Sequence, residues 1–363
     1  MRNRSSGREQ RFTGTMPVRA AHAIDRGALL AYLERHLEGF RGPIEIEQFR
    51  GGQSNPTYRV SAAGGRYVVR RKPPGKLLPS AHAIEREYRV LAALRGTGVP
   101  APRVHALCED AGVIGTPFYV MEHVEGHVHW EPWLPGREPE FRGAVFDAMN
   151  DGIARLHNLD HGRLGLGDFG RSGGYVARQI ARWSRQYRAS ETETIAEMDR
   201  LIEWLPAHLP DDDETALVHG DYRLDNLIFA HGRPRLLAIL DWEISTLGHP
   251  VADFAYHCMP WRLPPETGRG FSGLDLAALG IPAEEAYLAA YCRRTGRDRP
   301  VHWEFYMAYN MWRLAAILQG IMGRVVDGTA ASEHAAEMGG MARTLAEFAW
   351  AQAQAIGGGA GGG

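Results

Sequence analysis

Three oxygen-bearing side chains occur close together near the middle of this 363-residue sequence. Asp221 and Asn226 stand five residues apart in HGDYRLDN, and Asp241 follows the apolar run LLAIL. A carboxylate, an amide and a second carboxylate at strand ends are what a phosphoryl-transfer site requires. Asp221 would orient an attacking hydroxyl and accept its proton. Asn226 and Asp241 would bind Mg²⁺, a hard cation that prefers oxygen ligands.

Each of these residues also has a purely structural interpretation. An aspartate after a strand is usually a cap or a turn former, and Asp241 alone would be interpreted in that way. Its order and spacing with Asp221 and Asn226 favour a joint role. We expect His219 to orient the loop through hydrogen bonds, and Asp225 to be a surface or turn residue.

The surrounding residues predict a small sheet followed by a mainly helical part. Runs that alternate or are rich in β-branched residues, separated by turn residues, predict an antiparallel meander over residues 44–71. Asp25 is a candidate N-cap for a first helix, and Ser80 for a helix that runs to about Arg95. Further strands are predicted at residues 103–107 and 117–122, two short ones around the central motifs, and helices at 141–159, 175–190, 284–294, 302–324 and 332–356.

Composition limits the class of protein. The sequence is 44% hydrophobic and 23% charged, which is typical of a globular protein, and its formal net charge of −2 indicates neither a nucleic acid nor an anionic membrane as a partner. Cys108, Cys258 and Cys292 are odd in number and far apart, so they form neither a disulfide framework nor a metal motif. With no stretch of roughly 18 apolar residues, we expect a cytoplasmic location.

The motifs HGDYRLDN and ILDWE resemble those of the aminoglycoside phosphotransferase family, which is related to the choline kinases and the protein kinases. The D-x-x-x-x-N spacing also occurs in the kinase catalytic loop. FRGGQSNPTYRV, GTPFYVMEHVEG and HPVADFAY follow the order of the family, so the resemblance covers about residues 44–256. It implies an α+β, bilobal protein kinase-like fold, with a small antiparallel N-lobe that carries one helix and a larger, mainly helical C-lobe.

This resemblance also predicts the domain organisation. Residues 23–124 would form the nucleotide-binding N-lobe, and residues 125–356 the C-lobe with the catalytic loop, the metal site and the acceptor pocket. We expect residues 1–22 to be a disordered extension and residues 357–363 a flexible glycine-rich tail.

Phosphate contacts are implied at two places. Gly52, Ser54 and Asn55 lie in GGQSNPTY, the turn that would cover the nucleotide phosphates with close backbone approach and polar donors. Arg223, between the expected base and the expected metal ligand, could stabilise the transferring phosphoryl group.

The segment FYVMEHV resembles the hinge between the kinase lobes. The Glu122 carbonyl and the Val124 N–H would meet the adenine edge, with Met121 behind the ring. Asp253 in HPVADFAY matches the family aspartate that braces the catalytic loop from the start of a helix.

Arg70 stands in YVVRR where kinases carry a phosphate-contacting lysine. Strand alternation directs Arg70 and Lys72 to one face and Arg71 to the other, so the phosphate contact is open among the three. Glu87, on the apolar face of the next helix, is favoured as the partner of Arg70 because a buried carboxylate needs one. Alternatively, the three cations form a solvated edge strand.

The resemblance implies transfer of the γ-phosphoryl group of ATP, or GTP, with Mg²⁺, to a hydroxyl of a small molecule. Several strings are most similar to the kinase-like domain fused to some acyl-CoA dehydrogenases, which implies a hydroxyacyl-CoA-like acceptor. An aminoglycoside is less favoured, because the C-terminal helices lack the acidic concentration that would meet a polycation. The sequence does not decide the oligomeric state.

Two alternatives compete with this interpretation. Arg70 in place of lysine favours a pseudokinase module that binds nucleotide without turnover, whereas the intact Asp221, Asn226 and Asp241 oppose it. A metallohydrolase would instead use His219, Asp221, Asp241 and His249.

Overall fold

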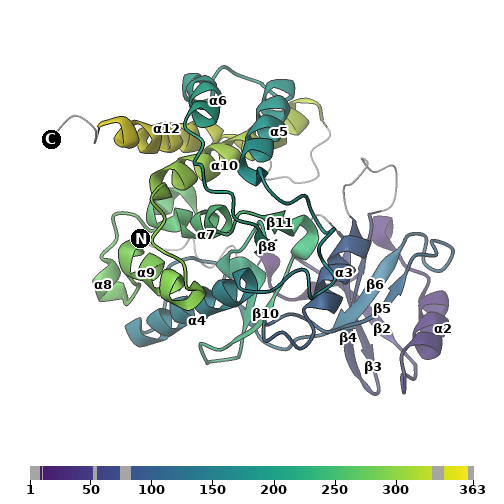
Figure 1. Ribbon diagram of the computed structural model, residues 1–363. Coiled ribbons are helices and arrows are strands. Elements are labelled where there is room, and N and C mark those ends of the chain that lie inside the picture. The colour runs from purple at the N-terminus through teal and green to yellow at the C-terminus, as the bar shows by residue number, and fades with distance from the viewer. Residues whose placement is uncertain (1–8, 10, 52–54, 74–82, 329–338, 359–363) are drawn as a thin grey trace. The chain divides into compact units, whose positions relative to one another are not determined.

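The computed structural model describes residues 9, 11–51, 55–73, 83–328 and 339–358 (Figure 1). The chain divides into two compact units, each assembled from segments that are distant in sequence. Unit 1 contains Met1–Arg155, Gly162–Leu166 and Arg223–Ser245, and unit 2 contains Leu156–His161, Gly167–Tyr222 and Thr246–Gly363.

A six-stranded antiparallel sheet forms the centre of unit 1, in the order β1-β2-β3-β4-β6-β5. Its strands are β1 (Thr15–Met16), β2 (Glu45–Phe49), β3 (Thr57–Ala62), β4 (Gly65–Arg71), β5 (Val104–Cys108) and β6 (Phe118–Glu122). The predicted meander is confirmed, with Thr57 opposite Arg70 between β3 and β4. Because β4 lies inside the sheet, the alternative of a solvated edge strand is wrong.

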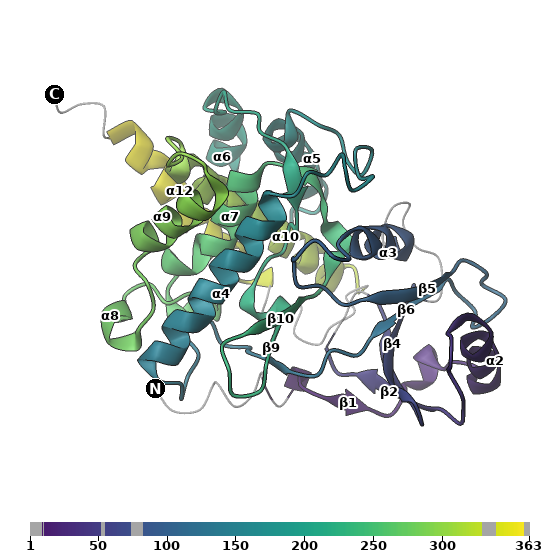
Figure 2. The same ribbon diagram turned by 60° about the horizontal axis from the view of Figure 1, so that its bottom comes forward.

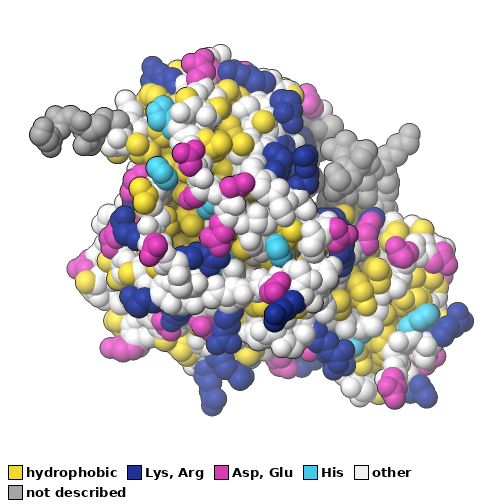
Figure 3. Space-filling model, viewed as in Figure 1, with side chains coloured by type: hydrophobic (Ala, Val, Ile, Leu, Met, Phe, Trp, Pro, Cys, Tyr) yellow, Lys and Arg dark blue, Asp and Glu magenta, His cyan; other side chains and the backbone are white. Residues whose placement is uncertain are grey.

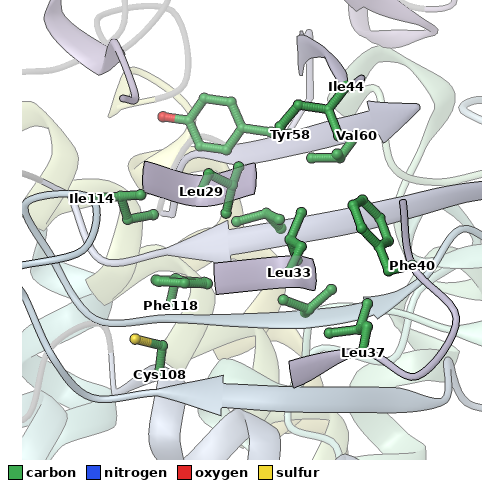
Figure 4. Packing of buried hydrophobic residues seen from close by; sticks show 12 residues of the cluster. Leu29, Leu33, Leu37, Phe40, Ile44, Tyr58, Val60, Cys108, Ile114 and Phe118 are labelled. Carbon is green, nitrogen blue, oxygen red and sulfur yellow. The ribbon is translucent and has the colours of Figure 1, made fainter. Parts of the chain in front are cut away.

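Helices α2 (Arg26–His36) and α3 (Ile84–Ala93) cover opposite faces of this sheet (Figure 2). The Asp25 carboxylate accepts a hydrogen bond from the Ala28 N–H at 2.9 Å, as its predicted N-cap role requires. Leu29 and Leu33 of α2 are fully buried against strand residues of the sheet (Figure 4). For α3 the N-cap residue is Ala83, whereas Ser80 lies outside the described residues.

The N-terminal segment corrects a prediction. Residues 1–22 were expected to be disordered, but β1 pairs with β2, with Thr15 opposite Phe49. The Thr15 hydroxyl donates to Glu47 at 2.8 Å, and Trp130 donates to the Thr13 hydroxyl at 2.9 Å. Residues 13–16 contain no apolar period, so their order comes from hydrogen bonds that an exposed sheet edge offers to any chain.

A second small sheet in unit 1 carries part of the central motif. Its strands β7 (His127–Val128), β9 (Leu227–Phe229) and β10 (Leu236–Ile239) lie in the order β10-β9-β7. Gly126 precedes β7, and a Cβ there would lie 2.4 Å from a methyl carbon of Ile228 and 2.5 Å from the Phe229 carbonyl oxygen. Only glycine permits this close approach. Gly126 therefore lets the chain after the expected hinge pack directly on β9.

Unit 2 is mainly helical. Its helices are α5 (Tyr175–Ala189), α6 (Ala196–Ala207), α7 (Pro250–Cys258), α8 (Leu276–Leu279), α9 (Glu284–Thr295), α10 (Trp303–Val326) and α12 (Ala342–Gly358). Strands β8 (Ala216–Val218) and β11 (Thr246–Gly248) pair antiparallel. The predicted helices are present, except that residues 329–338 lie outside the described part, and α6 and α8 were not predicted. α4 (Pro139–His157) runs from unit 1 into unit 2.

The described helices include none that is both long and apolar enough to cross a lipid bilayer.

Two buried histidines make the folding stability depend on pH. Burial lowers the pKa of His257 to about 4 and that of His129 to about 3. Unfolded histidine titrates near pH 6.5, so the unfolded chain binds more protons as the pH falls below that value. We expect each histidine to lower the free energy of unfolding by about 2 kcal/mol between pH 7.5 and 5.0. Urea unfolding at both pH values measures this. In His257→Gln the loss should shrink by about one histidine's share, and an unchanged loss would contradict the assignment.

Candidate active site

Asn226 and Asp241 come together at the ends of two paired strands of unit 1. Asn226 ends η2 (Leu224–Asn226) just before β9, and Asp241 follows β10. The Leu240 N–H donates to the Asn226 carbonyl at 2.8 Å, so the expected metal ligands flank a direct backbone hydrogen bond. Asp241 precedes η3 (Trp242–Ile244) with φ of +65°, a left-handed conformation that non-glycine residues rarely adopt and that clusters at functional sites.

A buried cation lies against Asp241. Arg70 Nε is 2.9 Å from Glu87 Oε2, which confirms the predicted ion pair between β4 and α3. Its Nη2 lies 2.7 Å from Asp241 Oδ1 and 3.3 Å from Glu243 Oε2. One guanidinium therefore bridges three carboxylates, which the planar fork of arginine permits and a single ammonium does not.

The electrostatics of this cluster keep Arg70 charged. Burial alone would lower the pKa of Arg70, but the carboxylates of Glu87 and Asp241 outweigh it and hold that pKa well above its ordinary value. Burial raises the pKa of Glu87, and the guanidinium of Arg70 opposes that rise. Each buried group therefore depends on the other for its charge.

The neighbouring cations of β4 have other partners. Lys72 Nζ lies 2.8 Å from the Glu85 carboxylate, on the same side of the sheet as Arg70. Arg71 points to the opposite side, where it donates to the Ile114 carbonyl at 3.0 Å and lies over the Tyr58 ring. The predicted alternation is confirmed: within the described part of the chain, Arg70 contacts Asp241, whereas Lys72 pairs with Glu85 and Arg71 with the Ile114 carbonyl.

The expected phosphate loop is described only in part. Gly52 and Ser54 lie outside the described residues. Asn55 is buried, and its amide donates to Glu243 Oε2 at 3.1 Å. Glu243 thus contacts both Asn55 and Arg70, a role that we did not predict. The sequence indication of this role was the position of Glu243 two residues after Asp241, in DWE.

The expected hinge begins in β6, a strand that lies inside the six-stranded sheet. Met121 is buried in β6, and Glu122 ends this strand, where its N–H donates to the Arg103 carbonyl at 2.8 Å. Val124 lies between β6 and β7 and is half-buried. Their contacts with a nucleotide stay predictions.

Asp221 belongs to unit 2, in the loop after β8. The loop is held by Asp253 of α7, whose carboxylate accepts the His219 N–H at 2.9 Å and the Gly220 N–H at 2.8 Å. Gly220 has φ of +85°, which favours glycine at this turn. His219 is buried, and its Nδ1 accepts the Asp221 N–H at 3.2 Å. Asp253 and His219 thus orient the loop, as the sequence predicted.

His157 extends this brace further than we expected. It was predicted to be a packing residue, but its Nε2 contacts Asp253 at 3.1 Å and its Nδ1 contacts the Tyr291 hydroxyl at 2.7 Å. Burial alone would raise the pKa of Asp253, yet hydrogen bonds from His157 and from the His219 N–H hold that pKa below its usual value. Burial lowers the pKa of His157. The network therefore contains an ionised Asp253 and a neutral His157.

Arg223 begins the segment of unit 1 that carries the expected metal ligands. Its Nη1 lies 3.2 Å from the carboxylate of Asp225, which lies in the turn η2 and pairs with this cation. Within the part of the chain that the structure describes, no three His, Cys, Asp or Glu side chains are grouped so as to hold a metal ion. The side-chain oxygens of Asn226 and Asp241 would suit Mg²⁺, which usually takes only one or two protein ligands and completes its shell with water and phosphate.

The fold is that of the protein kinase-like phosphotransferases. The chain belongs to the Phosphotransferase enzyme family, whose profile matches residues 45–309. The predicted α+β, kinase-like fold is confirmed by its structural neighbours. One is a choline kinase from Cryptosporidium parvum, with a TM-score of 0.65 over 92% of this chain and 97% of that one; at 12% identity it shows the fold alone.

More similar proteins are also known. A structure described as a putative aminoglycoside phosphotransferase from Ralstonia eutropha is 53% identical, with a TM-score of 0.85, and covers 92% of this chain and 99% of that one. Mouse acyl-CoA dehydrogenase family member 10 is 49% identical over 339 residues, which are 93% of this chain but 32% of that protein. The chain thus spans about a third of the length of this relative.

Proposed function

We propose that this protein transfers the γ-phosphoryl group of ATP, or GTP, to a hydroxyl group of a small anionic metabolite. The observation that carries the proposal is the cluster in unit 1, where the Arg70–Glu87 pair contacts Asp241 beside Asn226. A cation, its carboxylate partner and two oxygen ligands for a divalent metal are the parts that kinase-type phosphoryl transfer requires. Family membership independently supports this class of reaction.

The proposed reaction needs a proton acceptor, and we assign this role to a residue of unit 2. The acceptor oxygen forms a bond to the γ-phosphorus, the bond from that phosphorus to the β–γ bridging oxygen breaks, and ADP leaves. Asp221 accepts the hydroxyl proton. The hydrogen bonds from His219 and Gly220 to Asp253 hold the loop that carries this carboxylate, so the loop does not need to reorganise during transfer.

Unit 1 supplies the charges for the nucleotide. Asn226 and Asp241 would hold Mg²⁺, which neutralises phosphate charge when it is bound. Arg70 would contact phosphate oxygens, and Arg223 would stabilise the transferring group. Gly52, Ser54 and Asn55 would cover the phosphates, while Met121, Glu122 and Val124 would bind the adenine ring.

The charge on α5 supports an anionic acceptor. Arg178, Arg182 and Arg185 are spaced four and three residues apart on one face of this helix, which contains no Asp or Glu. Lys and Arg side chains gather over α5 in Figure 3. Burial raises the pKa of the half-buried Tyr175 at the start of α5, and the charges of Arg313, Arg182 and Arg178 oppose that rise.

The acceptor that best suits these charges is a hydroxyacyl-CoA. Coenzyme A carries phosphates that arginines bind, whereas an aminoglycoside is a polycation that this face would repel. The names of the longer relatives, which refer to acyl-CoA dehydrogenases, point to the same class of metabolite.

The test is turnover with Mg·ATP and paired acceptors. We expect ADP formation with hydroxybutyryl-CoA in at least one of its positional isomers, and none above background with kanamycin. Arg182→Glu should raise KM for the CoA ester about tenfold, because a favourable contact with an anion becomes repulsive. Arg293→Glu, at an exposed arginine of α9, is the matched control and should leave KM unchanged. Phosphorylation of kanamycin alone would contradict the proposed acceptor.

A nucleotide-binding module without activity is the second candidate, favoured by the arginine at position 70. It predicts tight ATP binding and no phosphoryl transfer to any acceptor in a metabolite extract. Phosphorylated products that disappear in Asp221→Asn would exclude it.

A further inference from the structure

A tyrosine of α7 contacts the proposed base directly. The Tyr256 hydroxyl donates a hydrogen bond to Asp221 Oδ1 over 2.6 Å, and the tyrosine is only 6% exposed. This distance lies in the range of charge-assisted O–H···O⁻ hydrogen bonds. Tyr256 follows Asp253 by three residues, so both side chains lie on neighbouring positions of one helical face. One helix thus holds the backbone of the catalytic loop and also the carboxylate that the loop carries.

Arg313 of α10 holds this tyrosine from the other side. Its guanidinium carbon lies 5.3 Å from the centre of the Tyr256 ring, and its Nη2 donates to the Gly220 carbonyl at 3.2 Å. The arginine is buried, which alone would lower its pKa. Tyr309, Tyr175, Tyr256 and Asp253 outweigh burial and raise the pKa of Arg313 above its usual value.

The charge on Arg313 has two effects on Tyr256. A cation over the ring restrains the ring, and it also strengthens the phenol as a hydrogen-bond donor because it stabilises negative charge on the oxygen. Since Arg313 also contacts the loop backbone at Gly220, the ring and the loop are fixed to the same guanidinium.

We propose that Tyr256 is a positioning residue for phosphoryl transfer, whose hydroxyl fixes the rotation of the Asp221 carboxylate. This inference rests on the proposed function, in which Asp221 accepts the proton of the acceptor. An aspartate side chain rotates about two bonds, so holding one oxygen also sets the direction of the other. A misdirected base loses rate without loss of nucleotide affinity, because it acts only during the chemical step.

The first test removes only the hydroxyl. Tyr256→Phe keeps the ring under Arg313, and we expect kcat to fall about 10- to 100-fold while KM for ATP changes less than about twofold. The reaction measured is transfer from Mg·ATP to the hydroxybutyryl-CoA isomer that the unaltered enzyme phosphorylates, or phosphate release to water. Tyr287→Phe is the matched control, because it removes a buried hydroxyl that contacts His257 instead. Its kcat should not change.

The second test separates positioning from packing. In the Asp221→Asn background, Tyr256→Phe should cause no further loss of the residual rate, because the hydroxyl acts through the carboxylate. An equal loss in both backgrounds would show a packing role and overturn the inference. Full activity of Tyr256→Phe alone would also overturn it and leave the proposed function intact, whereas full activity of Asp221→Asn would overturn both.

Discussion

Replacing Asp221 by asparagine is expected to lower kcat about 1,000-fold or more while ATP still binds. The substitution keeps the size of the side chain but removes the proposed proton acceptor, and a general base contributes about 10²- to 10⁴-fold to such reactions. The brace from Asp253 to the loop backbone does not involve the Asp221 side chain, so the fold should persist. Single-turnover kinetics and equilibrium ATP binding measure the two effects separately.

A surface carboxylate provides the control for this variant. Asp151→Asn alters a half-buried aspartate on α4 that pairs with Arg155, one turn along the same helix. This variant should keep its full rate. If Asp221→Asn retained more than about a tenth of the original kcat, that rate would exceed what loss of a general base allows and the assignment would be wrong.

Replacing Arg70 by methionine is expected to lower the free energy of unfolding by about 3–5 kcal/mol. The substitution leaves Glu87 buried beside Asp241 and Glu243 without a cation, and removing one partner of a buried ion pair is far more costly than removing both. ATP affinity should fall as well, because the proposed contact of the Arg70 guanidinium with the phosphates is lost. Urea unfolding and nucleotide binding measure these losses.

Two further variants make the prediction specific. Arg70→Lys restores the residue usual in kinases and keeps the charge, but a single ammonium cannot bridge three carboxylates, so we expect an intermediate loss of stability. Arg71→Met acts on the other face of the same strand. It should cost about 1–3 kcal/mol by leaving the Ile114 carbonyl unsatisfied, with ATP affinity unchanged. Equal loss of ATP affinity in both methionine variants would contradict the assignment of Arg70.

Short-range patterns predicted much of this structure. Turn residues between β-branched runs gave the strands of the meander, and strand alternation placed Arg70 and Arg71 on opposite faces. The buried face of α3 selected Glu87 over Glu85 as the partner of Arg70, because only a buried carboxylate requires a cation. These inferences rest on periods of two and 3.6 residues, which the sequence displays directly.

Contacts between distant segments were not predictable in the same way. The hydrogen bond from Tyr256 to Asp221 and the brace from His157 to Asp253 join elements that no local period relates. A lone histidine in a helix and a tyrosine in an apolar helix look like packing residues. The strand β1 was not predicted for a different reason. Pairing at a sheet edge uses backbone hydrogen bonds and requires no particular residue pattern.

Neither compact unit corresponds to one continuous stretch of the chain, because Arg223–Ser245 belongs to unit 1 although unit 2 segments precede and follow it. A cut anywhere between Leu156 and Thr246 would therefore separate parts of the same unit. During evolution such a protein can be joined to others at its ends, but its two units cannot be exchanged one at a time by a single recombination event. That constraint agrees with its relatives, in which a sequence of nearly this whole length recurs as one portion of a longer protein.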